Sequence, residues 1–260
     1  MLDDLLKPVV AADVSILTVD IERLPGIAYA WEPKTRYIPA SQFLRWPSLL
    51  CFAAKWYGQR RLIFHASWHD GGMEAMVKAA WDLYDRADII VSYNGIRFDD
   101  KHLRSEWLQA GMSLPRPWKD VDLYAEVRRS FGFESKSLDQ VCKRLGIPAK
   151  AGHYDMAQAE AAANGDVKAQ RALERYNRND VKITELAYDR MRGSLPGHPV
   201  LSGPVDDLTL RCNQCGSDDL EPNGTYRAVV QQRAAYRCRS CGANVSASHL
   251  KRISNVRGIR

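Results

Sequence analysis

The sequence has no run of eighteen apolar residues, about the length that a membrane-spanning helix requires. It therefore predicts no span across a membrane. The N-terminus, Met1-Leu2-Asp3-Asp4, also lacks the basic region followed by an apolar one that marks a secretory signal. We therefore expect a cytoplasmic protein that works in a reducing compartment.

Cysteine is scarce, with six in 260 residues, and the six are unevenly placed. Cys51 and Cys142 stand alone in apolar surroundings and are expected to be inert core residues. The other four form two close pairs near the C-terminus. In a reducing compartment, such pairs indicate metal binding rather than disulfides.

Charge is nearly balanced except at the C-terminus. The net charge is +6 at pH 7. From residue 207 onward the sequence holds nine Lys or Arg and four Asp or Glu, whereas the first 206 residues hold twenty-eight and twenty-seven. A basic tail on a neutral body suggests a polyanionic partner, and a merely solvated surface is the other interpretation.

A break in composition divides the chain. Three prolines and three glycines between residues 193 and 204 cannot continue a helix. We predict a body over residues 1–193, a linker over 194–206 and a small module over 207–260. A module of about fifty residues usually needs additional stabilisation in order to fold, for example by a bound metal ion.

Apolar periodicity and turn residues predict an α/β fold. A strand is expected over residues 14–22, and residues 27–31 are expected to pair with it as a hairpin. The other expected strands are residues 50–57, 61–66 and 88–93. The expected helices are residues 73–86, a helix from 98 or 99, 137–145, and 167–191 with a break near Tyr176. This order predicts a mixed sheet with helices packed on it.

The first strand carries two acids, Asp20 and Glu22. Side chains two residues apart on a strand share a face, so these carboxylates repel each other unless a cation binds between them. Ligands that offer only oxygen favour a hard ion such as Mg²⁺ or Mn²⁺. A strand edge that faces water explains this stretch equally well, so the rest of the chain has to decide.

Two more acids occur in positions that suit a site. Asp99 follows a turn at the end of an apolar strand, the position where ligand-binding sites are found in α/β sheets. Its alternative role is that of a helix N-cap. Tyr176 and Asp180 are four residues apart on the last helix of the body and share one face, which could also be an ordinary polar face. Four carboxylates could hold the pair of divalent ions that supports an in-line phosphoryl displacement.

The chain resembles a known family through three motifs in order, Asp20-x-Glu22, Asn94-Gly-x-x-Phe-Asp99 and Tyr176-x-x-x-Asp180. They are similar to the motifs of the DEDD (DnaQ-like) superfamily of 3′–5′ exonucleases, which implies a ribonuclease-H-like fold over roughly residues 14–192. Tyr176 matches the tyrosine subtype, because the histidine subtype would need a His where this chain has Arg175. Residues 133–139 resemble the exonuclease domain of family-B DNA polymerases.

The resemblance implies a metal-dependent exonuclease that releases nucleoside 5′-monophosphates from the 3′ end of DNA, which we favour over RNA. Asp20, Glu22 and Asp180 would hold the ion on the side of the nucleophile. Asp20 would bridge to a second ion, supported by Asp99, and Tyr176 would orient the attacking water. No polymerase domain follows in the sequence, so we expect a stand-alone, phage-like nuclease.

Other residues could line the site or contact the substrate, namely Asn94, Phe98, Trp31, Tyr37, Lys150 and His153. For Lys150 and His153, a solvated loop is the other interpretation. An RNA exonuclease or a structure-specific endonuclease on the same fold is an alternative function. A non-catalytic, nucleic-acid-binding adaptor is an alternative of a different class.

The C-terminal module contains Cys212-x-x-Cys215 and, after twenty-two residues, Cys238-x-x-Cys241. This spacing indicates Zn²⁺ and resembles a zinc ribbon, with four free thiols as the alternative. Four thiolates close the coordination sphere, so the ion would be structural. The basic residues that could contact a nucleic-acid backbone are Arg227, Arg233, Arg237, Lys251, Arg252 and Arg257. Docking to a replication or repair protein is the alternative use of the module.

Overall fold

The computed structural model of the chain describes residues 14–148, 152, 154–201, 209–227 and 232–247. The described residues form two compact units, Ser15–Ala187 and the part from Tyr188 onward. Several sequence predictions lie outside the described residues: those for the lead-in, for part of the linker, and for Lys150, His153, Lys251, Arg252 and Arg257.

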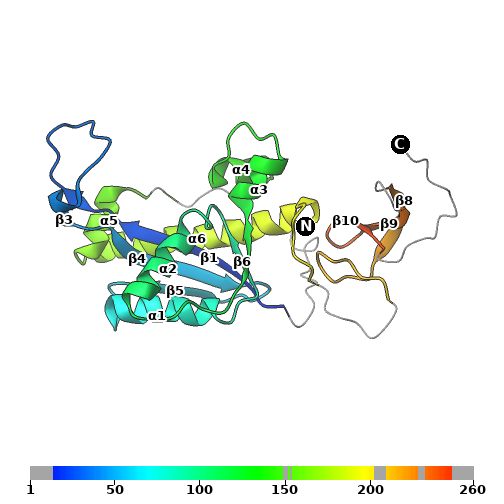
Figure 1. Cartoon of the computed structure of the whole chain (residues 1–260), viewed down its shortest axis with the longest axis horizontal. Coiled ribbons are helices and arrows are strands. Elements are labelled where there is room, and N and C mark those ends of the chain that lie inside the picture. Colours follow the sequence, from blue (N-terminus) through cyan, green and yellow to red (C-terminus); the bar gives the residue numbers. More distant parts are fainter. Residues whose placement is uncertain (1–13, 149–151, 153, 202–208, 228–231, 248–260) are drawn as a thin grey trace, which may run out of the picture. The chain divides into compact units, whose positions relative to one another are not determined.

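The first unit is built on a five-stranded mixed sheet with the order β5-β4-β1-β6-β7 (Figure 1). Its strands are β1 (Ile16–Leu24), β4 (Ser48–Trp56), β5 (Leu62–Ala66), β6 (Ile89–Ser92) and β7 (Lys119–Asp122). The central strand β1 pairs antiparallel with β4 along most of its length and parallel with β6 at its start. β1 therefore has a partner strand along one edge and, on the other edge, only at its start.

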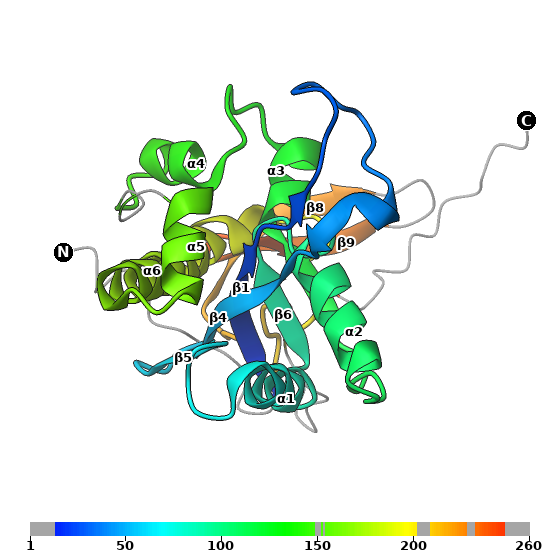
Figure 2. The same ribbon diagram turned by 90° about the vertical axis from the view of Figure 1, so that its left-hand side faces the viewer.

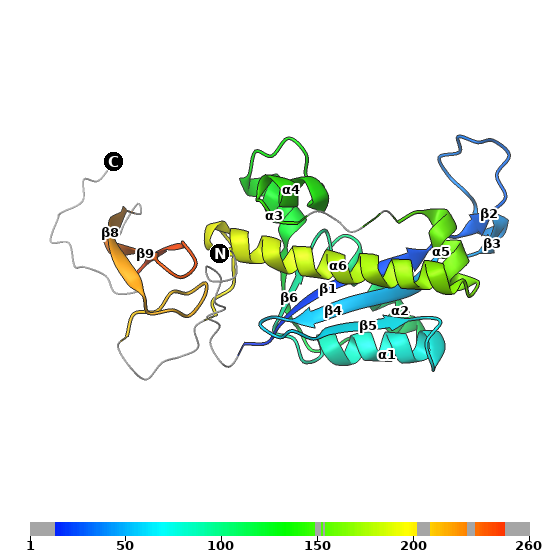
Figure 3. The ribbon, with the colours of Figure 1, turned by 180° about the vertical axis from the view of Figure 1, so that it is seen from behind.

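Helices cover both faces of this sheet. Figure 2 shows α1 and α2 beside one face, and Figure 3 shows α6 along the other. The helices are α1 (Gly72–Tyr84), α2 (Asp99–Gln109), α3 (Leu123–Ser130), α4 (Leu138–Arg144), α5 (Met156–Ala163) and α6 (Val167–Met191). The predicted mixed sheet with helices packed on it is confirmed.

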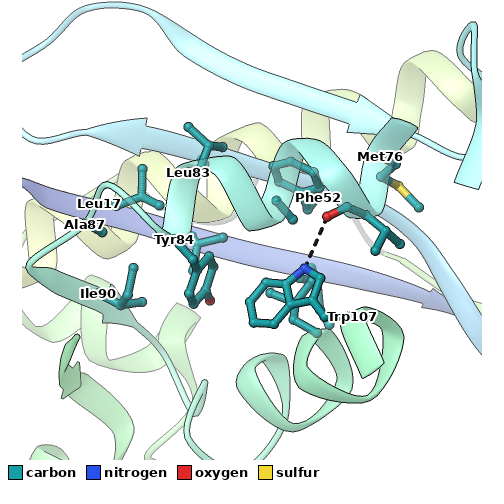
Figure 4. Packing of buried hydrophobic residues seen from close by; sticks show 14 of the residues in the cluster. Leu17, Phe52, Met76, Leu83, Tyr84, Ala87, Ile90 and Trp107 are labelled. Atoms are coloured by element: carbon teal, nitrogen blue, oxygen red, sulfur yellow. Dashed lines mark hydrogen bonds between the residues drawn. The ribbon is translucent and has the colours of Figure 1, made fainter. Parts of the chain in front are cut away.

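The two faces carry separate apolar clusters because side chains alternate along each strand. Between the sheet and helices α1 and α2, Leu17 and Phe52 pack with Tyr84 and Trp107, all fully buried (Figure 4). The Trp107 indole N–H donates to the Val77 carbonyl at 3.1 Å, so its polar atom is satisfied inside the core. On the other face the cluster comprises β4 side chains such as Cys51 and Ala53, two alanines of α5, and Leu173 and Val181 of α6.

The predicted hairpin between residues 14–22 and 27–31 is wrong. The antiparallel partner of β1 is β4, which pairs with it as far as Leu24, and β2 (Ile27–Ala28) pairs instead with β3 (Phe43–Arg45). A short helical turn, η1 (Ala40–Gln42), precedes β3. Tyr29 and Trp31, which lie in the apolar stretch that predicts the second strand, are exposed at 67% and 94%.

The predicted break in the last helix is also wrong, because α6 runs without interruption from Val167 to Met191. Its sequence contains no Gly or Pro, the residues that would stop it. Sequence patterns also missed β7, α3 and α5. The strand β7 is short and reads Lys-Asp-Val-Asp, so it lacks the apolar run on which the strand predictions depended.

The second unit contains a short turn, η2 (Arg192–Ser194), and a three-stranded antiparallel sheet with the order β10-β9-β8. Its strands are β8 (Leu220–Arg227), β9 (Gln232–Cys238) and β10 (Asn244–Ser246). Its buried cluster is small and centres on Cys212, Cys215 and Cys238, with Ala243 beside them. Because this apolar cluster is so small, the four cysteines are the main groups that can stabilise the fold of this unit.

Candidate active site and cysteine cluster

Three carboxylates from two elements converge on one point of the first unit. Asp20 and Glu22 come from β1, and Asp180 comes from α6. One oxygen of each lies within 4.8 Å of the others, a group that could hold a metal ion. In the β1–β4 register, Asp20 lies opposite Ala53 and Glu22 lies opposite Cys51. Because Ala53 and Cys51 pack with α6, both acids lie on the sheet face that α6 covers. The alternation of β1 thus accounts for the arrangement.

A hollow of about 330 Å³ opens at this point. The residues that line it are Asp20, Tyr93, Asn94, Tyr124, Lys136, Ser137, Leu138 and Asp180. Of the predicted lining residues Asn94 and Phe98, only Asn94 belongs to this set, and the Phe98 ring packs edge-on against His102. The hollow combines two acids with Lys136, so it can accept a ligand that carries both an anion and a bound cation.

A buried asparagine supports the first acid. The Asn177 side-chain amide donates to Asp20 Oδ2 at 2.6 Å and to the Asp20 backbone carbonyl at 3.1 Å. Asn177 is fully buried, and the Cys51 thiol lies 4.0 Å from its Oδ1. The sequence motifs do not include this residue. The only signal was an amide inside a helix, directly after Tyr176, where polar residues of this kind are unfavourable without a partner.

Asp99 does not join the three carboxylates. Its Oδ1 accepts the backbone N–H of Ile21 at 2.9 Å. β6 pairs with β1 only as far as the Thr18–Val91 pair, so Asp99 supplies an acceptor where the neighbouring strand has ended. Burial raises the pKa of Asp99 to about 7, and the charge of Asp122 adds to that effect.

The turn after β6 holds a constrained conformation beside the acids. Asn94 has φ +74°, in the left-handed region, which Asn tolerates better than most residues. The buried Asp122 accepts the backbone N–H groups of Asn94 at 2.9 Å and Ile96 at 3.3 Å. A side chain at Gly95 would overlap Ser92. Asp122 was not predicted, although an Asp just before a helix is a common N-cap signal.

Tyr176 lies on α6 one turn before Asp180, as predicted. Its ring stacks against Tyr154, with 5.8 Å between the ring centroids and an angle of 27°. The Tyr154 hydroxyl donates to the Arg23 carbonyl at 2.6 Å. This stack fixes the plane of the Tyr176 ring beside the strand that carries Asp20.

The four C-terminal cysteines form a second cluster, in the second unit. Their sulfur atoms all lie within 4.8 Å of one another. Cys212 Sγ is 3.7 Å from Cys241 Sγ, and Cys215 Sγ is 3.6 Å from Cys238 Sγ. A tetrahedral ion with Zn–S bonds of about 2.3 Å requires sulfur–sulfur edges of about 3.8 Å. The donor set and its spacing therefore fit a structural Zn²⁺ site and are compatible with a zinc ribbon.

A comparison with family models places the chain in a known group. A model of the RNase H superfamily matches residues 51–192, which is more than half of the sequence. The chain belongs to the RNase H superfamily. The match begins in β4, so it leaves out β1 with Asp20 and Glu22. A search of curated proteins found no match to this superfamily member.

The same fold occurs in a solved polymerase. This RNase H superfamily member is similar to the structure of the family B DNA polymerase from the hyperthermophilic archaeon Pyrobaculum calidifontis, with a TM-score of 0.52 and 20% identity. The similarity covers 69% of this chain and 25% of that chain, so this protein spans about a quarter of the polymerase. The predicted ribonuclease-H-like mixed sheet flanked by helices is confirmed. The superfamily supports a nuclease-type activity.

None of the helices in the described ranges combines the length and the apolar character that crossing a membrane would require.

Proposed function

We propose that this protein is a metal-dependent 3′–5′ exonuclease of the tyrosine subtype that hydrolyses DNA to nucleoside 5′-monophosphates. The observation that carries the proposal is the convergence of Asp20, Glu22 and Asp180 beside the turn at Asn94, within an RNase H superfamily fold. The similarity to a family B DNA polymerase supports it, because such enzymes carry a proofreading exonuclease of this fold.

The donor set supports a site for divalent metal ions. Three carboxylate groups within 4.8 Å offer only oxygen ligands, which suit Mg²⁺ or Mn²⁺. Asp20, Glu22 and Asp180 would hold the ion on the side of the nucleophile, and Asp20 would also bind the second ion. Asp99 is held by the Ile21 N–H, which favours contact with the second ion through water.

The remaining steps are assigned to groups of the chain and its substrate. Two divalent ions, when bound, would activate a water and neutralise charge on the departing 3′ oxygen. Tyr176 orients that water through its hydroxyl. Tyrosine ordinarily ionises near pH 10, so it positions the water and does not remove its proton. Asn177 keeps the Asp20 carboxylate in its orientation.

We assign the module of residues 207–260 as a zinc ribbon whose ion is held by the four cysteines Cys212, Cys215, Cys238 and Cys241. Four thiolates leave no open coordination position, so the module has no catalytic role. The body over 1–193 carries the hydrolysis, and residues 194–206 join the two. The module recruits nucleic acid or a replication or repair protein.

The proposal is tested with a 5′-labelled single-stranded DNA oligonucleotide in Mg²⁺ or Mn²⁺ and in EDTA. We expect a ladder that shortens from the 3′ end with metal and no product in EDTA. Asp20→Ala should abolish the ladder while the fold is retained, and Asp82→Ala should leave it unchanged because Asp82 is an exposed acid paired with Lys78.

Matched substrates separate the rival functions. Hydrolysis of the corresponding RNA but not of DNA would indicate an RNA exonuclease, and cleavage of a circular single strand would indicate an endonuclease. Binding of nucleic acid without metal-dependent hydrolysis would indicate an adaptor. Full activity of a correctly folded Asp20→Ala variant would contradict the site assignment.

A further inference from the structure

A second hollow adjoins the one that contains the acids. Its volume is about 290 Å³, and it shares the residues Asn94 and Tyr124 with the acidic hollow. The residues that line it are Asn94, Ile96, Arg97, Asp122, Tyr124, Ala125, Arg128 and Arg129. Three arginines therefore line a hollow that begins where the acidic one ends.

The acid in this lining is already satisfied by backbone groups. Asp122 is buried and accepts the N–H groups of Asn94 and Ile96 in the turn. It also accepts the N–H groups of Tyr124 and Ala125 in the first turn of α3. Four N–H dipoles stabilise its carboxylate, so it competes weakly for the arginines.

The three arginines differ in their partners. Arg129 is neutralised, because its guanidinium contacts both carboxylate oxygens of Glu126 at 2.7 and 2.8 Å. Arg128 lies over the Tyr124 ring, with its guanidinium carbon 5.8 Å from the centroid. Within the described ranges of the chain, no acidic side chain lies within 4.0 Å of the guanidinium of Arg97 or Arg128. These two charges remain available to a ligand.

We propose that Arg97 and Arg128 bind a second phosphate of the strand whose scissile phosphate lies at Asp20 and Asp180. This inference rests on the proposed function, because it needs a phosphodiester chain at the acids. A guanidinium offers paired N–H donors that match phosphate oxygens, and a chain that passes from the acidic hollow across Asn94 and Tyr124 reaches both arginines. The contact makes a polynucleotide a better substrate than a mononucleotide ester.

The test compares two substrates in the full chain with Mg²⁺ or Mn²⁺. The double variant Arg97→Gln/Arg128→Gln should raise KM for a single-stranded DNA oligonucleotide about tenfold and leave kcat unchanged. It should leave kcat/KM for the p-nitrophenyl ester of thymidine 5′-monophosphate within about twofold, because that ester has no second phosphodiester. Lys78→Gln, at an exposed lysine of α1 that is paired with Asp82 and lines neither hollow, should leave both values unchanged.

Binding in EDTA tests the contact without hydrolysis. Fluorescence anisotropy with a labelled oligonucleotide should give a weaker Kd for the double variant. The slope of the logarithm of its binding constant against the logarithm of the salt concentration should be less steep by about 0.7, the value for one phosphate contact to a single strand. An unchanged KM, Kd and salt slope would overturn the inference, and so would an equal loss on the ester. If the wild type hydrolyses neither substrate, the proposed function fails, and the binding measurements alone decide on the arginines.

Discussion

Asn177 and Asp20 are 157 residues apart in sequence, and the amide of one donates a 2.6 Å hydrogen bond to the carboxylate of the other. A second bond from the same amide reaches the Asp20 backbone carbonyl. The carboxylate therefore has one oxygen fixed by a neutral donor. A neutral donor orients the carboxylate without competing with a metal ion for its charge, as an arginine or lysine would.

Replacement of Asn177 should lower activity without removing any of the four acids. Asn177→Ala frees the Asp20 carboxylate to rotate, so kcat should fall about tenfold to a hundredfold and metal affinity should weaken, as expected when a supporting contact to a metal ligand is lost. Asn177→Asp should be worse, because it sets a like charge against Asp20. Asn164→Ala, at an exposed amide after α5, serves as the control. Measured kcat and Mn²⁺ titrations check the order, and equal activity of the three variants would contradict it.

The parts of the site that were predictable from sequence depend on local periodicity. The period of two along β1 places Asp20 and Glu22 on one face, and the spacing of four on α6 places Tyr176 near Asp180. Both arrangements need only the geometry of one element. The helices α1, α2, α4 and α6 were predictable for the same reason, since each shows apolar spacing or a clear start and end signal.

What could not be predicted depends on contacts between distant segments. The failed hairpin shows this, since Ile27 has β propensity but the antiparallel partner of β1 is β4, a strand more than twenty residues away in sequence. The contact of Asp99 with the Ile21 N–H was not predictable either. It depends on where β6 stops pairing with β1, after the Thr18–Val91 pair.

Tyr176→Phe should slow hydrolysis by about tenfold to a hundredfold and leave measurable activity, because the hydroxyl orients the water while the metal site remains complete. The ring stack with Tyr154 would be retained, so the fold should be unchanged. Tyr154→Phe is the matched control, since it removes a hydroxyl that donates to the Arg23 carbonyl. It should cost about 1 kcal/mol of unfolding free energy and leave kcat nearly unchanged. The opposite ranking of the two variants in kcat would reject the role of Tyr176.

The cysteine cluster makes a separate prediction about metal content. The protein purified without chelator should contain one Zn²⁺ per chain by elemental analysis, and Cys212→Ser should reduce this value nearly to zero. Hydrolysis of short oligonucleotides should be retained, because none of these cysteines belongs to the acidic hollow. Cys142→Ser removes a buried thiol of the first unit and should keep the zinc. A wild type without zinc, or a Cys212→Ser variant that keeps it, would contradict the assignment.

The two acids at the start of α2 make stability depend on pH. Burial raises the pKa of Asp100 to about 8, and the charge of Asp120 contributes further. The pKa of Asp99 is raised to about 7, mainly by burial. The Tyr84 hydroxyl donates to Asp100 at 3.0 Å and favours its charged form, but burial outweighs this bond. An aspartate in the unfolded chain has a pKa of about 3.9.

Since both folded pKa values lie above the unfolded value, the folded chain binds more protons between about pH 4 and pH 8. The contribution of these two acids to the free energy of unfolding should therefore be greatest at the acid end of this range and fall as the pH rises, with a slope of up to about 1.4 kcal/mol per pH unit for each group. Urea unfolding in EDTA at pH 5, 6, 7 and 8 measures it. Asp100→Asn removes one titrating group but can keep an amide next to Tyr84, so its stability should fall less steeply with pH than that of the wild type. Asp82→Asn, at an exposed acid, should keep the wild-type slope, and an Asp100→Asn variant that also kept it would show that Asp100 is ionised in the folded chain over this range.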